Sequence, residues 1–189
     1  MILGITGGTG CGKTTLLKEI EARGGLVLDC DAVYHELLTR DCALLNAIAH
    51  RFPGVVVDQK LERKKLGAIV FADEQALRDL NAITHGAIKA EIVRRLSENP
   101  KLAAIDAIAL FEGGLAQLVD TTVAITAPRA ERIRRLMMRD GISAQYAENR
   151  INAQKSEAWF REMCEHTLHN DGTAEEFREK CSEFLDSIL

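Results

Sequence analysis

The chain has 189 residues, of which 47% are hydrophobic and 28% charged, values typical of one globular domain with a sizeable apolar core. The formal net charge of −4 argues against a large nucleic-acid-binding face, and no apolar run is long enough to cross a membrane as a helix. The five cysteines are scattered without a CxxC pair, which argues against a disulfide framework or structural zinc site and favours free thiols in a cytoplasmic location.

Apolar runs alternate with stretches of helical periodicity along the chain. Strands are expected at residues 2–6, 26–29, 103–110, 122–126 and, with a weaker pattern, 167–169. Most of these runs are too apolar on both faces to lie at a surface, so helices should cover both sides of the sheet. The sequence therefore predicts an α/β fold, a three-layer sandwich around a five-stranded parallel sheet.

The helical stretches include one unusually long connection between the second and third strands. Helices are expected at residues 14–22, 33–50, 62–71, 74–97, 129–139, 143–164 and 173–188. The connection, about 32–102, is long for a simple crossover and is predicted to be helical throughout. It is either an extra helical layer or an insertion that binds an acceptor at the carboxyl edge of the sheet, where ligands of such folds bind.

A glycine-rich loop follows the first expected strand and precedes an amphipathic helix. Residues 7–14 match G-x-x-x-x-G-K-[ST] without a mismatch, and this context distinguishes the motif from a chance turn. Backbone N–H groups of such a loop surround a phosphate, the lysine reaches the β- and γ-oxygens, and the hydroxyl ligates Mg²⁺. The side chain of Cys11 is expected to be incidental. The predicted ATP-binding residues are Gly8, Gly10, Cys11, Gly12, Lys13 and Thr14, the last also a Mg²⁺ ligand.

Acidic residues follow the second and third expected strands. Asp29 and Asp31 would point to opposite faces if the extended chain continued, so at most one is catalytic unless the chain turns. Asp31 is preferred because it opens a helix past the strand end, and the alternative is a helix N-cap. Glu112, which two glycines follow, is either a carboxylate held on a tight turn at the same edge or a solvated loop acid.

Residues 128–140 carry five arginines: Arg129, Arg132, Arg134, Arg135 and Arg139. Helical spacing places Arg132, Arg135 and Arg139 on one face, away from the apolar stripe. They form either a solvated surface or a mobile lid whose charges neutralise a phosphoryl group during its transfer.

Together these motifs resemble the dephospho-CoA kinase family. The match begins with TGG-x-G-x-GK-[ST]-T at residues 6–15. It continues with D-[AC]-D at 29–31, LN-x-[IL]-x-H at 80–85, the LFE-x-x-L part of LLFE-x-x-L at 110–115, M-x-RD at 137–140, RI-x-x-Q at 150–154 and N-x-G at 170–172. These ordered motifs cover nearly the whole chain. The chain departs from the family at Gly86 and Ile108, where proline is usual, and both departures concern backbone rigidity near the acceptor pocket.

The resemblance implies a P-loop kinase that uses ATP and Mg²⁺ to phosphorylate the ribose 3′-hydroxyl of dephospho-CoA, giving coenzyme A and ADP. Asp31 would act as the base, and Lys13 and Arg139 would stabilise the transferring group. Thr15, Arg139 and Asn170 would join the ATP site, while Thr6, Asp31, His85 and Glu112 would contact the acceptor. From the pattern alone, His85 is more typical of a helix-surface or core histidine.

As one kinase domain, 1–189, the chain would have a core at 1–31, 103–128 and 165–189, an acceptor-binding insertion at about 32–102 and a lid at about 129–164. We expect a monomer or weak homo-oligomer without a nucleic-acid or membrane partner. Two other functions remain open from the residues: a related kinase acting on a nucleoside monophosphate, or a nucleotide-binding switch without acceptor-specific turnover.

Overall fold

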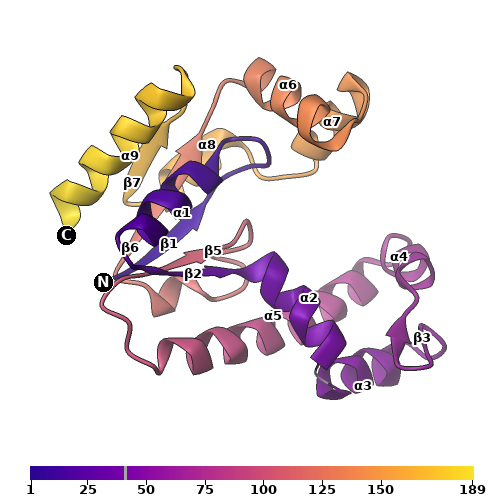
Figure 1. Cartoon of the computed structure of the whole chain (residues 1–189). Coiled ribbons are helices and arrows are strands. Elements are labelled where there is room, and N and C mark those ends of the chain that lie inside the picture. Colours follow the sequence, from indigo (N-terminus) through magenta and orange to yellow (C-terminus); the bar gives the residue numbers. More distant parts are fainter. Residues whose placement is uncertain (41) are drawn as a thin grey trace. The chain divides into compact units, whose positions relative to one another are not determined.

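The structure of the protein is a computed structural model that describes residues 1–40 and 42–189 (Figure 1). The chain divides into two compact units. The first unit comprises Met1–Leu28 and Asn99–Leu189, and the second comprises Asp29–Glu98. Within the described residues, no helix combines the length and the apolar character that a membrane crossing requires.

A five-stranded sheet forms the centre of the first unit. Its strands lie in the order β2-β5-β1-β6-β7, and β1 pairs in parallel with both β5 and β6, as β6 does with β7. The bounds are Ile2–Thr6 (β1), Leu26–Asp29 (β2), Ala103–Asp106 (β5), Thr121–Thr126 (β6) and His166–His169 (β7). The predicted α/β fold with a five-stranded parallel sheet is confirmed.

The third predicted strand is shorter than expected. Residues 103–110 were predicted as one strand, but β5 ends at Asp106 and turns occupy residues 108–114. The backbone curls back there, since the carbonyl of Leu110 accepts hydrogen bonds from the N–H groups of Leu115 and Ala116. Leu110 is fully buried all the same, so the apolar run reflects core packing rather than an extended strand.

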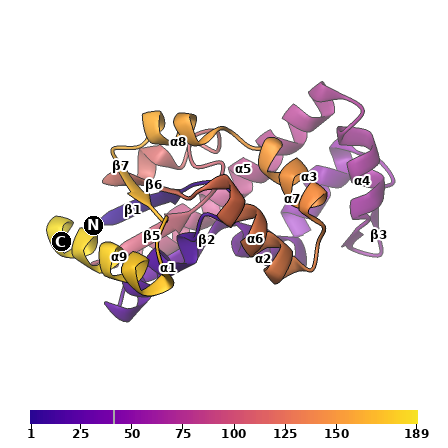
Figure 2. The same ribbon diagram turned by 90° about the horizontal axis from the view of Figure 1, so that it is seen from above.

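Helices cover both faces of this sheet (Figure 2). Helices α1 (Lys13–Ala22) and α9 (Ala174–Ile188) pack together on one face, and α8 (Glu157–Met163) lies against β6 on the other. The buried core includes Leu3 and Ile5 of β1, Ile20 of α1, and Phe177 and Leu185 of α9. A short 3₁₀ helix, η1 (Ala116–Leu118), precedes β6.

Two further helices of the first unit, α6 (Arg129–Asp140) and α7 (Ala144–Asn152), pack through Leu136, Ala147 and Ile151. The single helix predicted for residues 143–164 is in fact α7 followed by α8. The break occurs because Ser156 starts a new helix, its hydroxyl accepting a hydrogen bond from the backbone N–H of Trp159.

The second unit has its own apolar core, which includes Ile48, Phe52 and Leu66. Its elements are α2 (Cys30–Arg40), α3 (Cys42–Arg51), β3 (Val56–Val57), β4 (Lys60–Leu61), α4 (Arg63–Val70) and α5 (Glu74–Leu96). The prediction that this segment is helical throughout is wrong, because β3 and β4 form an antiparallel hairpin. The predicted helix 33–50 is divided between α2 and α3, and residue 41 lies outside the described residues.

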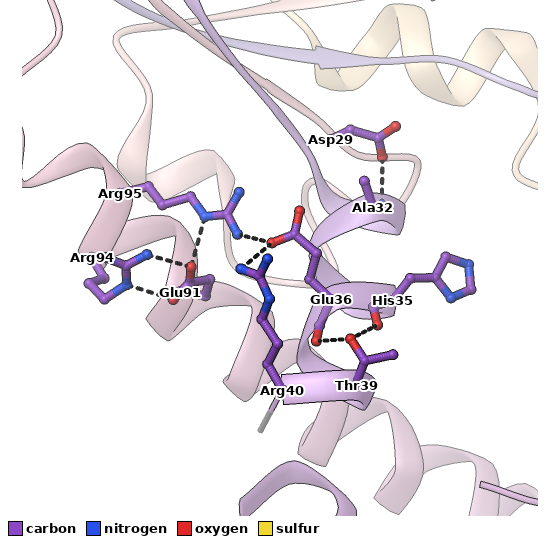
Figure 3. A network of polar contacts seen from close by, with 9 residues as sticks. All are labelled: Asp29, Ala32, His35, Glu36, Thr39, Arg40, Glu91, Arg94 and Arg95. Carbon is purple, nitrogen blue, oxygen red and sulfur yellow. Dashed lines mark hydrogen bonds and ion pairs between the residues drawn. The ribbon is translucent and has the colours of Figure 1, made fainter. Parts of the chain in front are cut away.

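Charged side chains join α2 to α5 within this unit (Figure 3). Arg95 Nη2 lies 2.6 Å from Glu36 Oε2, and Arg95 Nε lies 2.8 Å from Glu91 Oε1. Arg94 also binds Glu91, with Nη2 at 2.7 Å from Oε1. Hydrogen bonds from Arg94 and Arg95 lower the pKa of Glu91 to about 2.

Candidate active site

The predicted phosphate loop connects β1 to α1. Gly10 and Gly12 have φ values of 78° and 101°, in the left-handed region that favours glycine. A Cβ at Gly12 would also lie 2.3 Å from Nδ2 of Asn170, so this position has no room for a side chain. Helix α1 begins at Lys13, immediately after Gly12, and directs its N-terminal N–H groups toward the loop.

Lys13 lies against the loop and the neighbouring strand β5. Its ammonium donates a hydrogen bond to the carbonyl of Gly7 at 3.2 Å and lies 3.8 Å from Asp106 Oδ1. Asp106, whose register partner is Ile5 in β1, was not predicted from the sequence. The available signal was an acid that ends an apolar run beside a phosphate loop. This carboxylate and the exposed hydroxyl-bearing residue Thr14 offer the hard oxygen donors that Mg²⁺ prefers.

Arg132 of α6 rests on the phosphate loop. Its side chain is only 8% exposed, and burial lowers the pKa of its guanidinium. Nε donates to the carbonyl of Thr9 at 2.9 Å, and Nη2 lies 3.4 Å from Gln154 Oε1. A Cβ added to Gly8 would lie 2.2 Å from Arg132 Nη2. The guanidinium therefore occupies the space directly beside Gly8.

Gln154, between α7 and α8, completes the contacts to Thr9. Its Oε1 accepts a hydrogen bond from the backbone N–H of Thr9 at 2.8 Å. Both backbone polar groups of Thr9 are thus bound by side chains from outside the loop, Gln154 on one and Arg132 on the other. From the sequence, Gln154 was recognised only as part of a family motif and was not assigned to the site.

Asn170 and Arg135 hold the other half of the loop. Asn170, only 4% exposed, donates from Nδ2 to the carbonyl of Cys11 at 2.9 Å. Arg135 Nη1 lies 3.3 Å from the same carbonyl and 3.4 Å from that of Gly10, while its Nη2 donates to Asn170 Oδ1 at 3.2 Å. The thiol of Cys11 is buried, and burial raises its pKa. The contacts of Cys11 with Asn170 and Arg135 are therefore made by its backbone.

Arg139 lies apart from these contacts, although it shares their helix face by spacing. Its guanidinium binds the carboxylate of Asp140, with Nε 2.7 Å from Oδ1 and Nη2 3.0 Å from Oδ2. Arg150 lies 2.5 Å from the same carboxylate. The two arginines lower the pKa of Asp140 to about 2. Helix spacing alone did not distinguish Arg139 from the arginines that contact the loop. The Arg139 guanidinium binds the neighbouring Asp140 instead of the loop, and spacing does not show this.

A cavity of about 340 Å³ opens beside Arg132. The residues that line it include Arg129, Lys155, Ser156 and Glu157 together with Arg132 and Gln154. Three cations face one acid in this lining, which favours an anionic occupant.

The predicted acceptor residues occupy both units. In the first unit, Thr6 is buried and its hydroxyl donates to the carbonyl of Ile108 at 3.2 Å, and Glu112 is exposed within the turns that follow β5. Thr15, predicted for the ATP site, lies in the first turn of α1, where its N–H donates to the carbonyl of Gly12 at 3.1 Å. In the second unit, His85 is partly exposed on α5.

Asp31, also in the second unit, lies in the first turn of α2 and is exposed. The alternative role considered for it, a helix cap, is filled by Asp29 instead. Asp29 Oδ1 accepts a hydrogen bond from the backbone N–H of Asp31 at 2.8 Å. It also accepts one from the backbone N–H of Ala32 at 3.1 Å (Figure 3). The chain turns into a helix at Cys30, so the strand alternation considered for the two acids ends at Asp29.

Comparison with known proteins identifies the family of this chain. The profile of the family described as dephospho-CoA kinase matches residues 1–176. A dephospho-CoA kinase of Anaeromyxobacter dehalogenans is 36% identical over 193 aligned residues, covering 99% of this chain and 92% of the relative.

Solved structures show the same fold. The crystal structure of TT1252 from Thermus thermophilus matches with a TM-score of 0.84 and 30% identity, covering 100% of this chain and 98% of that one. Dephospho-CoA kinase from Campylobacter jejuni matches with a TM-score of 0.70 at 24% identity, covering 99% and 96% of the two chains. On the family match over residues 1–176, this chain belongs to the dephospho-CoA kinase family.

Proposed function

We propose that this chain phosphorylates the ribose 3′-hydroxyl of dephospho-CoA with ATP, giving coenzyme A and ADP in the last step of coenzyme A synthesis. The observation that carries the proposal is a phosphate loop whose Thr9 and Cys11 backbone groups are bound by Arg132, Gln154 and Asn170, in a chain that matches the family over residues 1–176. Such a loop binds the phosphates of a nucleotide through backbone N–H groups.

In this proposal, ATP binds through the loop residues Gly8, Gly10, Cys11 and Gly12 with Lys13, Thr14 and Thr15. Lys13 turns from the carbonyl of Gly7, its neighbour at 3.2 Å, to the β- and γ-oxygens of ATP. Asn170 keeps the loop in shape through the carbonyl of Cys11. These contacts hold the γ-phosphoryl group in place while it is attacked.

Asp31 takes the proton of the 3′-hydroxyl as its oxygen attacks the γ-phosphorus atom and the bond to the leaving ADP breaks. Two features support this role. Asp31 follows strand β2. This strand belongs to the same sheet as β1, and β1 is the strand that the phosphate loop follows. Its carboxylate is also not needed as the cap of α2, since Asp29 caps that helix.

For the acceptor, we propose contacts from Thr6, His85 and Glu112 in addition to Asp31. The acceptor-binding region is the predicted insertion at 32–102, and the lid is the predicted segment 129–164. Arg139 remains a predicted catalytic and ATP-binding residue. Its guanidinium is bound to Asp140 and has to leave that carboxylate to reach a phosphate.

Mg²⁺ would be held by the hydroxyl of Thr14, and the carboxylate of Asp106 near Lys13 fits the same role. When bound, the ion neutralises charge on the β- and γ-phosphates. We also propose a cytoplasmic monomer or weak homo-oligomer without a nucleic-acid partner, which the net charge of −4 supports.

The test is the release of ADP from ATP with and without dephospho-CoA, followed by mass spectrometry of the acceptor. We expect ADP release to depend on dephospho-CoA and the acceptor to gain one phosphate. An acceptor analogue that lacks only the 3′-hydroxyl should give no product, and nucleoside monophosphates should be poor acceptors. Turnover with the 3′-deoxy analogue, or a faster rate with a nucleoside monophosphate, would contradict the proposal.

A further inference from the structure

Arg132 is the one buried arginine among the five of α6. Within residues 1–40 and 42–189, no carboxylate oxygen lies within 4.0 Å of its guanidinium, and its hydrogen bonds go to neutral oxygens of Thr9 and Gln154. Glu157, the acid among the cavity residues, is already paired with Arg161 at 2.6 Å. Arg132 is therefore a cation that is 8% exposed and has no acidic partner among the residues described.

Such a cation is costly for a folded protein. Burial removes water from the guanidinium, and neutral carbonyl oxygens return only part of the lost solvation. Buried charges are normally paired, so an unpaired one in a polar site is a candidate for binding an ion of opposite charge. The position of Arg132, with Nη2 in the space where a Cβ of Gly8 would lie, puts this charge on the phosphate loop.

The remaining arginines of α6 are bound in other ways. Arg134 pairs with Glu131 at 2.8 Å, and Arg139 pairs with Asp140 at 2.7 Å. Arg129 donates to Asn152 Oδ1 at 2.9 Å and is exposed to a greater degree than Arg132. Arg135 uses its guanidinium to bridge the carbonyl of Cys11 and the side chain of Asn170. Among these five, only Arg132 combines burial with a position on the loop and the lack of a carboxylate within 4.0 Å.

The cavity of about 340 Å³ that Arg132 lines leaves room for an anion. Arg129 and Lys155 line the same space, so further positive charge faces it. Lys155 is held there with its ammonium 5.4 Å from the centre of the Trp159 ring.

From these observations we infer that Arg132 is a catalytic residue whose guanidinium contacts the γ-phosphoryl group of ATP during its transfer. This inference rests on the proposed phosphoryl transfer and names a residue that the family motifs did not single out. Arg132 donates N–H groups to the non-bridging oxygens and exchanges no proton. The acceptor oxygen forms the new bond to phosphorus, the bond to ADP breaks, and the proton passes to Asp31. Gln154 acts as a positioning residue, since it contacts both Arg132 and Thr9.

The experiment compares ATP and ADP affinity and turnover for the parent, Arg132→Met, Arg132→Lys and the control Arg134→Met. A guanidinium that contacts the γ-phosphate should favour ATP over ADP, which lacks this group. We expect Arg132→Met to weaken ATP binding about tenfold, leave ADP binding within about threefold and lower kcat by about 10²-fold or more. Arg132→Lys keeps the charge and should lie between the parent and Arg132→Met, whereas Arg134→Met should resemble the parent.

A purely structural role predicts a different pattern. If Arg132 only shapes the loop, ATP and ADP should lose affinity equally, and this result would overturn the inference, as would a kcat within threefold of the parent. Melting temperatures show whether Arg132→Met folds. If it does not, the ratio of ATP affinity to ADP affinity in Arg132→Lys decides between the two roles. If the parent lacks turnover with dephospho-CoA, the proposed function fails, but the two nucleotide affinities still decide the role of Arg132.

Discussion

Asp29 Oδ1 accepts a hydrogen bond from the backbone N–H of Asp31 at 2.8 Å, so the first acid of the pair caps the helix in which the second acid lies. The two carboxylates are two residues apart in the sequence, and in the proposed function they carry different tasks. Asp29 satisfies two N–H groups of α2 that have no partner within the helix, those of Asp31 and Ala32. Asp31 is thereby left available for the acceptor hydroxyl.

We predict that Asp31→Asn lowers turnover by roughly 10²–10⁴-fold without a comparable loss of stability or ATP affinity, because the amide cannot accept the proton. Steady-state rates, ATP binding and melting temperature check this. A variant that retains most of its rate would remove the catalytic role from Asp31 and make Glu112 the next carboxylate to examine.

Substitutions of Asp29 should affect stability rather than turnover. Asp29→Asn keeps a capping oxygen and should be mild in both rate and stability, whereas Asp29→Ala should cost about 1 kcal/mol of unfolding free energy. Urea unfolding of the two variants measures the difference. Equal stability of the Asp29→Asn and Asp29→Ala variants would mean that the hydrogen bonds to Asp31 and Ala32 do not hold in solution.

Lys13→Ala removes the ammonium that lies 3.2 Å from the carbonyl of Gly7 and 3.8 Å from Asp106. We predict a loss of turnover of about 10²-fold or more, because the charge on the β- and γ-oxygens loses its compensation in a water-poor site. The measurement is kcat at saturating ATP, with circular dichroism as the control for folding. Activity within threefold of the parent would contradict the assignment of the phosphate loop.

Arg139 and Arg134 provide a matched pair on the same helix, since each binds an acid in the resting structure. If Arg139 acts in a closed state of the lid, Arg139→Ala should lower kcat far more than it weakens ATP binding to the resting enzyme. Arg134→Ala should leave both quantities close to those of the parent. Similar effects of both substitutions on kcat would mean that Arg139 belongs to the solvated surface of the helix and has no catalytic role.

Much of the fold follows from patterns that the sequence displays locally. Most strands of the sheet are apolar because helices cover both faces, and these runs, with a weaker pattern at 167–169, locate all five strands along the chain. The hairpin in the second unit was missed because its strands have two residues each and its turn lacks glycine. Asp58 and Gln59 adopt positive φ values of 48° and 59° there, which residue type did not indicate.

The site was predictable where its residues are consecutive and less so where they meet through folding. The glycine loop and Lys13 form one continuous motif, so their positions follow from sequence alone. Arg132 and Arg139 share a helix face by spacing, yet Thr9 binds one and Asp140 the other. Asp106 was missed because its strand was predicted to continue to residue 110, which concealed an acid at the strand end.

The network around Glu91 predicts acid sensitivity of the second unit. Arg94 and Arg95 hold the pKa of Glu91 at about 2 in the folded chain, below its ordinary value of 4.5. A lowered folded pKa means that the unfolded chain binds the proton first, so the contribution to stability is present above pH 4.5 and is lost as the pH falls from about 4.5 toward 2.

We therefore expect the urea midpoint of the parent to fall between about pH 5 and pH 3, and the fall to be smaller in Glu91→Gln. At pH 7 the variant should be less stable than the parent, and the difference should shrink in acid. Glu148→Gln, a change on α7 in the other unit, is the control. An equal slope for parent and Glu91→Gln would show that Glu91 does not link folding to pH.

Gly86 lies in the interior of α5, with nothing within 4 Å of the place where a Cβ would be. Gly86→Ala should therefore raise the free energy of unfolding by about 0.5–1 kcal/mol, because glycine loses more backbone freedom in a helix than alanine does. Gly86→Pro, which introduces the residue usual in the family, should destabilise this chain by about 3 kcal/mol, since proline cannot donate the helical hydrogen bond and collides with the preceding turn. Urea unfolding of both variants shows whether each one raises or lowers the free energy of unfolding. A stabilising proline at this position would mean that α5 is interrupted near His85 in solution, as proline would require.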